Sequence, residues 1–262
     1  MIFPNDKKIG LALGSGAARG FAHIGVIKVL EKYNIPIDFV AGSSIGALIG
    51  GLYAATKDIA YVEDAAVRAD WRSMISFIDP TFGSGFIAGE KMQTFIASIL
   101  KDATFSTLKI PFATVATSLN DGQPFTAFGD DLNLAIRASI SMPFVFCPVH
   151  HEEKSLMDGG LSMPIPVSLA KGLGAEYVLA VDLESDYFEY PRDDVAVNLA
   201  EVGHDLTVLL SSRLAKEDLK SADLVVAPKL HDIKWNAFFS PEKTKDIIRR
   251  GEEAMERLLS EA

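Results

Sequence analysis

A serine at position 44 occupies the centre of the pentapeptide GSSIG at positions 42–46. The apolar run before it predicts a strand over 37–41, and the small residues after it predict a helix over 45–55. A strand-to-helix turn this tight strains the backbone of its central residue and exposes the side chain at a helix N-terminus, where unpaired N–H groups favour developing negative charge. Ser44 is therefore a candidate nucleophile, although a serine before a helix is also a common N-cap.

A second candidate element lies near the start of the chain, where a predicted strand over 9–13 runs into a small-residue loop over 14–20. Backbone N–H groups in such a loop can point at an anion without side-chain interference. Three interpretations compete: a site for a dinucleotide pyrophosphate, an oxyanion hole, or a loop that is glycine-rich only for close packing. The dinucleotide fingerprint needs glycine at its sixth place, which here is Arg19. We favour an oxyanion hole with backbone donors at Gly16 and Ala17, and with Arg19 tightening the loop or sensing the anion.

A serine nucleophile needs a partner that accepts its proton. The five histidines are His23, in the first predicted helix, His150 and His151, in a predicted hairpin turn, and His204 and His231, which have only the right chain order. None lies in a pattern that indicates catalysis, and a core or capping role is expected for His23. Asp158 follows a strand fragment and precedes two glycines. Such a pair alone most often marks a plain turn, but beside the serine and the loop it makes Asp158 the candidate general base.

The elements that must position these residues alternate between strand and helix. Strands are predicted over 9–13, 37–41, 111–118, 125–128, 144–150, 155–157, 177–183 and 224–227, and helices over 19–33, 45–55, 131–139, 167–173 and 195–214. Residues 58–103 are predicted to be mostly helical with a break at 79–85, and Ser240 is predicted to cap a C-terminal helix. This alternation implies a mainly parallel sheet covered on both faces. We expect one α/β domain over 1–262, with its motifs within about 9–227 and a helical extension over about 240–262.

Bulk composition limits the partners and the location of the chain. Its 262 residues are 48% apolar and 23% charged, as in ordinary globular proteins. The formal net charge of −10 argues against nucleic acid and against strong binding to an anionic membrane, although a local apolar patch could contact lipid transiently. The single cysteine, Cys147, forms no intrachain disulfide, which fits a reducing cytoplasm. Without a secretory signal or a run of about 20 apolar residues, we expect a soluble cytoplasmic protein.

Taken together, segments 14–26, 42–47 and 158–160 resemble the patatin-like phospholipases in their bacterial single-domain form. The resemblance extends to 136–143 and 164–166 and covers about 9–227. It implies a three-layer α/β/α fold and a serine–aspartate dyad that uses no histidine, metal or cofactor. By position, Ser44 is the nucleophile, Asp158 the base, and Gly16 and Ala17 hold the oxyanion donors. The supporting positions are Gly14, Ser15, Arg19, Gly20, Gly42, Gly46, Gly159 and Gly160.

The chain departs from the family pattern at Ser15 and Ala17, which replace glycines. Backbone donation survives this change if φ of Ala17 is negative, whereas a positive φ would strain the hole and weaken activity. The resemblance implies hydrolysis of acyl esters of phospholipids or lysophospholipids. Two alternatives stay open: a regulatory or adaptor protein with little turnover, and a histidine-dependent esterase. Apolar residues within 71–87 line either a lipid-entry cleft or a buried helix pair.

Overall fold

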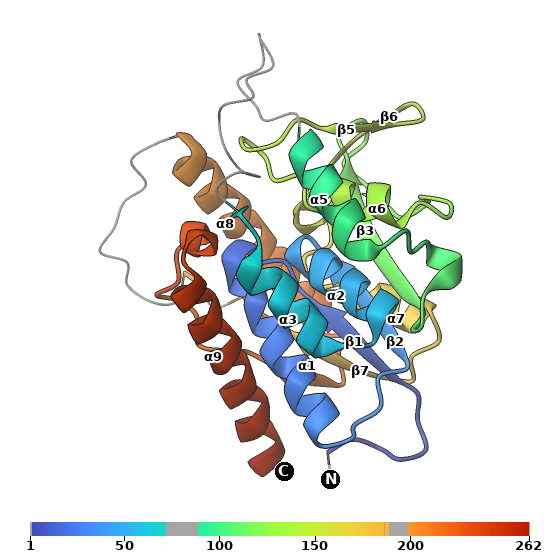
Figure 1. Cartoon of the computed structure of the whole chain (residues 1–262), viewed down its shortest axis with the longest axis vertical. Coiled ribbons are helices and arrows are strands. Elements are labelled where there is room, and N and C mark those ends of the chain that lie inside the picture. Colours follow the sequence, from blue (N-terminus) through green and yellow to red (C-terminus); the bar gives the residue numbers. More distant parts are fainter. Residues whose placement is uncertain (1, 72–88, 186, 189–198, 262) are drawn as a thin grey trace.

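The computed structural model describes residues 2–71, 89–185, 187–188 and 199–261 (Figure 1). In these residues, eight strands form one sheet in the order β5-β6-β3-β2-β1-β7-β8, with β4 paired to β3. The strands are β1 (Ile9–Leu13), β2 (Phe39–Ser43), β3 (Phe112–Ser118), β4 (Pro124–Phe125), β5 (Val149–His151), β6 (Lys154–Met157), β7 (Tyr177–Val181) and β8 (Leu224–Val226).

Helices flank this sheet. The α-helices are α1 (Ala22–Lys32), α2 (Ile45–Thr56), α3 (Ile59–Arg68), α5 (Glu90–Leu100), α6 (Leu132–Ser139), α7 (Val167–Gly172), α8 (Leu199–Leu219) and α9 (Pro241–Ser260). Short 3-10 helices are η1 (Ala17–Phe21), η2 (Phe105–Thr107), η3 (Gly159–Leu161) and η4 (Trp235–Phe239). No helix in the described part of the chain combines the length and the apolar character needed to cross a membrane.

The sheet is parallel at its centre and antiparallel at one side. β1 pairs in parallel with β2 and β7, β2 with β3, and β7 with β8. β6 pairs antiparallel with β3 and β5, and β4 pairs antiparallel with β3. The predicted fold class, a three-layer α/β/α arrangement around a mainly parallel sheet, is therefore confirmed, with an antiparallel side that carries Asp158 at the end of β6.

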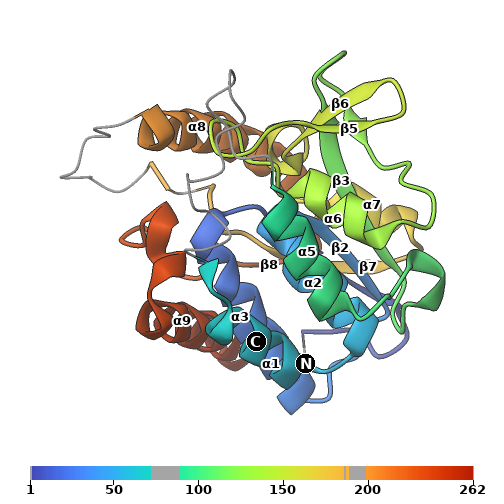
Figure 2. The same ribbon diagram turned by 45° about the horizontal axis from the view of Figure 1, so that its top comes forward.

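The alternation of side chains along β1 separates two core layers. Leu11 and Leu13 belong to a large apolar cluster with residues of α1, α2 and α9, whereas Ala12 belongs to a smaller cluster with residues of α7 and α8. This follows from the strand geometry, because successive side chains point to opposite faces of the sheet. In Figure 1, α1, α2 and α3 lie in front of the sheet, and Figure 2 shows α8 along one end of it.

The C-terminal helix begins where the sequence predicts. Ser240 Oγ accepts a hydrogen bond from the N–H of Lys243 at 3.3 Å, and Pro241 occupies the first turn of α9. α9 then packs along α1 so closely that a Cβ at Gly251 would lie 2.1 Å from the carbonyl oxygen of Ala22. Since α1 follows the small-residue loop through η1, α9 braces the helix that leaves that loop.

Several boundaries differ from those predicted. β2 begins two residues late and includes Gly42 and Ser43, because pairing with β1 and β3 continues into the turn. The strand predicted over 144–150 is reduced to β5, and Phe144 has a left-handed φ of 65°, which a strand does not tolerate. The strand predicted over 125–128 survives only in β4. The predicted break at 79–85 lies outside the described residues.

Candidate active site

Ser44 lies in the turn between β2 and α2, in a strained backbone conformation. Its φ is 53° and its ψ is −124°, outside the regions that side chains usually allow. Its N–H donates to Ser139 Oγ on α6 at 2.9 Å, which ties the turn to a second helix. The side chain is half-buried and stands at the first turn of α2. The strand, helix and α6 contact together hold the hydroxyl at one edge of the sheet.

The structure brings Ser44 and Asp158 together although they are 114 positions apart. Ser44 Oγ donates to Asp158 Oδ2 at 2.6 Å. The sheet register produces this contact, because β3 pairs Val115 with Ser43 on one side and Thr117 with Met157 on the other. The residues that follow β2 and β6 therefore emerge at nearly the same level on either side of β3.

Asp158 is buried, with 5% of its surface exposed, and its polar atoms have partners. Oδ1 accepts from the Gly160 N–H at 2.8 Å, and the backbone carbonyl accepts from Thr117 Oγ1 at 2.8 Å. Burial raises the pKa of Asp158 to about 7, and the negative charge of Glu184 adds to this, while the hydrogen bonds from Ser44 and Gly160 lower the pKa. A carboxyl group with this pKa can take up and release a proton near neutral pH.

The backbone N–H groups of the loop after β1 differ in whether they have a partner. The Gly14 N–H donates to Val181 O at 3.2 Å and the Ser15 N–H to Pro164 O at 2.9 Å, so these two amides are already used. In the described part of the chain, the N–H groups of Gly16 and Ala17 donate no hydrogen bond. Both residues line the pocket that contains Ser44. Ala17 has a φ of +48°, so the condition for a strained loop is met.

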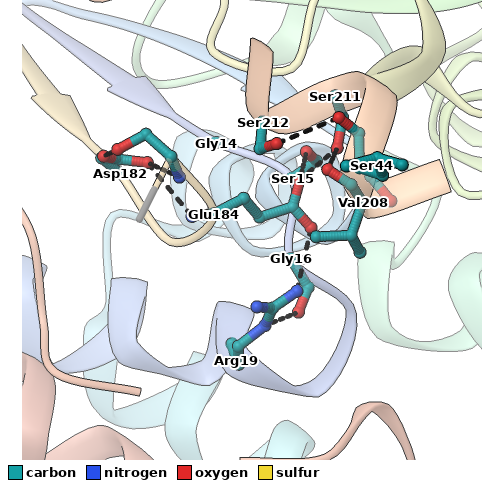
Figure 3. Close-up of polar contacts among 12 residues, drawn as sticks. Gly14, Ser15, Gly16, Arg19, Ser44, Asp182, Glu184, Val208, Ser211 and Ser212 are labelled. Carbon is teal, nitrogen blue, oxygen red and sulfur yellow. Dashed lines mark hydrogen bonds and ion pairs between the residues drawn. The ribbon is translucent and has the colours of Figure 1, made fainter. Parts of the chain in front are cut away.

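Arg19 is held away from this pocket by a buried carboxylate. It is 1% exposed, is absent from the pocket lining, and donates from Nη2 to Glu184 Oε1 at 3.1 Å. Its Nε also donates to the carbonyl oxygen of Gly16 at 3.2 Å (Figure 3). Of the two predicted roles, tightening the loop fits this placement, whereas direct contact with a bound anion does not.

A pocket opens beside the Ser44 hydroxyl. The space between its walls, with the open mouth included, is about 760 Å³. The predicted site residues Ser44, Asp158, Gly16 and Ala17 all line it. The other polar or glycine positions of the lining are Ser15, Gly160, Glu184, His204, Thr207 and Ser211, and the apolar lining comprises Ile45, Leu48, Trp71, Met92, Ile140, Met142, Val145, Phe146, Val208 and Phe238. Trp71 is therefore a pocket residue. Residues 72–87, the rest of the stretch predicted to form a cleft or a helix pair, lie outside the described residues.

The remaining predicted positions surround these groups. Gly14, Gly42, Gly46 and Gly159 each lie so close to a neighbouring backbone oxygen that a Cβ would collide with it, Gly20 packs against Ile45, and Gly160 faces Ser15. His23 is buried in the core, with Nε2 2.8 Å from the carbonyl oxygen of Gly14. Burial lowers the pKa of His23 to about 4, against the effect of this hydrogen bond. His204 lines the pocket from α8, and His150 and His231 are exposed.

Two residues of the site have no predicted role from the sequence. Ser139 lies within segment 136–143, which contributes to the family resemblance but carries no predicted role, and Glu184 lies in the polar run that follows β7. The signal for Glu184 was its position, because the ends of parallel strands meet at one edge of a sheet. The strands β1 and β7 pair in parallel, so the residues after them are neighbours.

The model of the patatin-like phospholipase family matches residues 11–171. The chain belongs to this family. Two solved structures share its fold. VipD from Legionella pneumophila has a TM-score of 0.55 and 11% identity, and the match covers 98% of this chain and 67% of VipD. The type III effector ExoU has a TM-score of 0.51 and 13% identity, and the match covers 98% of this chain and 53% of ExoU. At these identities the likeness concerns the fold alone.

Among curated proteins, an uncharacterized NTE family protein of Mycobacterium tuberculosis is 35% identical over 190 residues, which is 72% of this chain and 52% of that protein. The lysophospholipase nte1 of Aspergillus fumigatus is 32% identical over 185 residues, or 68% of this chain and 12% of the fungal protein. The lysophospholipase NTE1 of Yarrowia lipolytica is 35% identical over 187 residues, which is 69% of this chain and 13% of the yeast protein. The match thus spans about half of the mycobacterial relative and a small part of the fungal ones.

Proposed function

We propose that this patatin-like protein hydrolyses acyl esters of lipids through a Ser44–Asp158 dyad and an oxyanion hole at Gly16 and Ala17. The observation that carries the proposal is the 2.6 Å hydrogen bond from Ser44 Oγ to Asp158 Oδ2 in a pocket with a mainly apolar lining. A hydroxyl bonded to a buried carboxylate of raised pKa is a nucleophile beside its base.

In the reaction, Ser44 Oγ attacks the acyl carbonyl carbon while its proton passes to Asp158 Oδ2. The carbonyl oxygen becomes an oxyanion that accepts hydrogen bonds from the N–H groups of Gly16 and Ala17, where each donor is worth about 3 kcal/mol in comparable enzymes. The leaving alcohol takes the proton from Asp158, and an acyl ester of Ser44 remains. Water then attacks the carbonyl carbon of this ester while Asp158 accepts a proton from the water. The bond from this carbon to Ser44 Oγ breaks, Asp158 returns the proton to Oγ, and the fatty acid leaves.

The substrate class we propose is a phospholipid or a lysophospholipid. The apolar lining suits a single acyl chain, with the ester carbonyl at Ser44. The name lysophospholipase of the fungal relatives favours the one-chain substrate. Assays with matched one-chain and two-chain phosphatidylcholines should therefore give the larger kcat/KM for the one-chain lipid, and the reverse ranking would assign the two-chain class. The single-domain organisation and the cytoplasmic location stay predictions.

The test is labelling with a fluorophosphonate probe together with hydrolysis of p-nitrophenyl esters. Wild-type protein should label and turn over, and Ser44→Ala should lose both. Asp158→Asn should lower kcat by about 10³–10⁴-fold because the base is gone. The exposed His231 lies outside the pocket, so His231→Ala is the matched control. Well-folded wild-type protein that neither labels nor hydrolyses would favour the adaptor interpretation.

A histidine-dependent esterase has one specific observation in its favour, because His204 lines the same pocket. Ser44 Oγ nevertheless donates to Asp158. His204→Ala should therefore keep hydrolysis within about 10-fold of wild type, as expected for a wall residue. A loss in His204→Ala as large as that in Asp158→Asn would instead assign the proton transfer to the histidine.

A further inference from the structure

Glu184 is a buried carboxylate directed at the loop that carries the proposed oxyanion donors. It follows β7, whose last residue, Val181, accepts from the Gly14 N–H. Asp182 Oδ1 accepts from the Glu184 N–H at 3.1 Å and from the Ser185 N–H at 3.0 Å, which turns the chain sharply after the strand. This turn leaves Glu184 5% exposed, at the edge of the sheet where Ser44 also lies.

Three side-chain donors from two other segments converge on this carboxylate (Figure 3). Oε2 accepts from Ser15 Oγ at 2.9 Å and from Ser211 Oγ on α8 at 2.7 Å, and Oε1 accepts from Arg19 Nη2 at 3.1 Å. The guanidinium also lies over the ring of Tyr187, with Cζ 4.2 Å from the centroid. A buried charge is costly unless it is paired and hydrogen-bonded, and Glu184 meets both conditions.

The pair acts on the peptide bond that joins Gly16 to Ala17. Arg19 holds the carbonyl oxygen of Gly16 through Nε at 3.2 Å and through its backbone N–H at 3.1 Å. In a planar trans peptide the C=O and N–H point in opposite directions. Fixing the Gly16 carbonyl on one side therefore fixes the direction of the Ala17 N–H on the other, although Ala17 is held at a φ of +48°.

We propose that Glu184 is a positioning residue that holds the Gly16–Ala17 peptide in its strained conformation through Ser15 and Arg19, and that it couples this peptide to α8 through Ser211. The inference rests on the proposed hydrolase function. It also accounts for one departure from the family pattern, because Ser15 supplies a hydroxyl to Glu184 that a glycine would lack. Since α8 contributes Val208 and Ser211 to the pocket wall, one carboxylate links the wall that contacts the acyl chain to the donors that bind its carbonyl.

A change of charge at Glu184 should shift the pH dependence of kcat/KM through its effect on Asp158. The titratable or charged groups around it are Arg19 of η1, Asp182 and Tyr187 of its own segment, His204 of α8, and Asp158 after β6. Burial raises the pKa of Asp158, and the charge of Glu184 raises it further. Removing the negative charge of Glu184 lowers the pKa of Asp158, and the Arg19 cation that is then left uncompensated lowers it further. The acid limb of kcat/KM therefore moves to lower pH. Removing the cation instead moves the limb to higher pH.

The experiment compares Glu184→Gln and Arg19→Met with wild type in p-nitrophenyl ester hydrolysis, with fluorophosphonate labelling of Ser44 in each. Both variants should lose about 10–100-fold in kcat with KM within about 3-fold, because the oxyanion donors are misplaced while the pocket is intact. Their acid limbs should shift in opposite directions. Glu217→Gln, an exposed carboxylate of α8, is the control and should match wild type.

Ser211→Ala keeps the inference testable if Glu184→Gln does not fold. It removes one donor to the carboxylate and should lower kcat about 3–10-fold. Wild-type activity in Ser211→Ala would overturn the coupling to α8. Wild-type kcat in Glu184→Gln, or equal losses in both charge variants without a shift of either limb, would overturn the positioning role. Failure of the wild-type protein itself to label or hydrolyse would instead refute the proposed function.

Discussion

The turn at Ser44 and the loop at Ala17 both hold a residue at positive φ, 53° and 48°, but they are supported in different ways. The turn is closed by its own neighbours, because a Cβ at Gly42 would lie 2.3 Å from the carbonyl oxygen of Gly46. The loop is held by Glu184, which is 169 positions from Ser15 and 165 from Arg19. The turn thus depends mainly on close backbone packing, with one side-chain contact from Ser139 to the Ser44 N–H, whereas the loop depends also on a carboxylate that is distant in the sequence.

This difference predicts different sensitivities. A turn closed by close backbone contacts leaves no room for an added atom, because interiors are close-packed and the backbone atoms cannot move aside. The loop at Ala17 depends on the three contacts that Ser15, Arg19 and Ser211 make with the buried Glu184 carboxylate, and replacing Glu184 disturbs all three. Substitutions and pH should therefore separate the two regions.

The largest effect is expected when a methyl group is added at a glycine of each region. Gly42→Ala should cost about 3 kcal/mol or more in the free energy of unfolding, because its Cβ meets backbone atoms that cannot move. Gly16→Ala should cost about 1–2 kcal/mol, because its Cβ meets the side chain of Leu183, with Cδ1 at 2.9 Å. Urea unfolding measures both. Equal costs would show that the two regions are closed in the same way.

The second effect concerns His23, which supports the loop through the carbonyl oxygen of Gly14. Burial lowers its pKa to about 4 in the folded protein, below the value of about 6.5 for an unfolded chain. The unfolded state therefore binds more protons between these values, and the stability contributed by neutral His23 is full above pH 6.5 and is lost as pH falls toward 4.

His23→Gln removes this proton uptake. Its stability deficit relative to wild type should narrow by about 2 kcal/mol between pH 7.5 and pH 4.5 in urea unfolding, since only wild type loses the contribution. The comparison between wild type and variant is necessary because Asp158, whose pKa is raised to about 7, stabilises the folded state as pH falls. This contribution is the same in both proteins and cancels in the difference of their unfolding free energies. His150→Gln, at an exposed hairpin position, is the control. A deficit that stays constant with pH would contradict the burial of a neutral imidazole.

The smallest effect is relief of strain at Ala17. A glycine at φ +48° avoids the steric cost of about 1–2 kcal/mol that a side chain meets there, minus its larger loss of backbone entropy. Ala17→Gly should therefore raise the free energy of unfolding by about 0.5–1 kcal/mol and kcat by about 2-fold. Ala18→Gly, at the next position and without a positive φ, should lower stability by a similar amount. Destabilisation in both variants would mean that Ala17 stores no strain.

The sequence predicts the parts of the site that are formed by neighbouring residues better than the parts that are formed by residues distant in the chain. The strand and helix around Ser44 follow from an apolar run, small residues and glycines that are adjacent in the chain, and the structure places β2 and α2 there. The family resemblance added the pairing with Asp158, which lies 114 positions away. Ser139 could not be found by pattern, because a single serine in a helix has no periodicity of its own. The position of Glu184 after a strand was a signal, but its meaning depends on which strands pair.

The ends of the strands were also hard to predict, because they depend on pairing with strands that are distant in the sequence. The apolar run over 37–41 locates β2, but its end is set by backbone pairing with Leu13 and Val115 across two neighbouring strands. The strand predicted over 144–150 failed at Phe144, whose left-handed conformation no local pattern indicates. Local propensity thus identifies an element, and tertiary pairing decides where it begins and ends.

The position of β7 limits how this chain can be shortened. The family match ends at residue 171, before β7, which pairs with the whole length of β1, and before α9, which covers α1. A fragment cut at that point would leave β1 with a row of unsatisfied peptide groups and an uncovered apolar helix beside it. Open sheet edges of this kind recruit other chains, so such a fragment should aggregate even though it retains both Ser44 and Asp158.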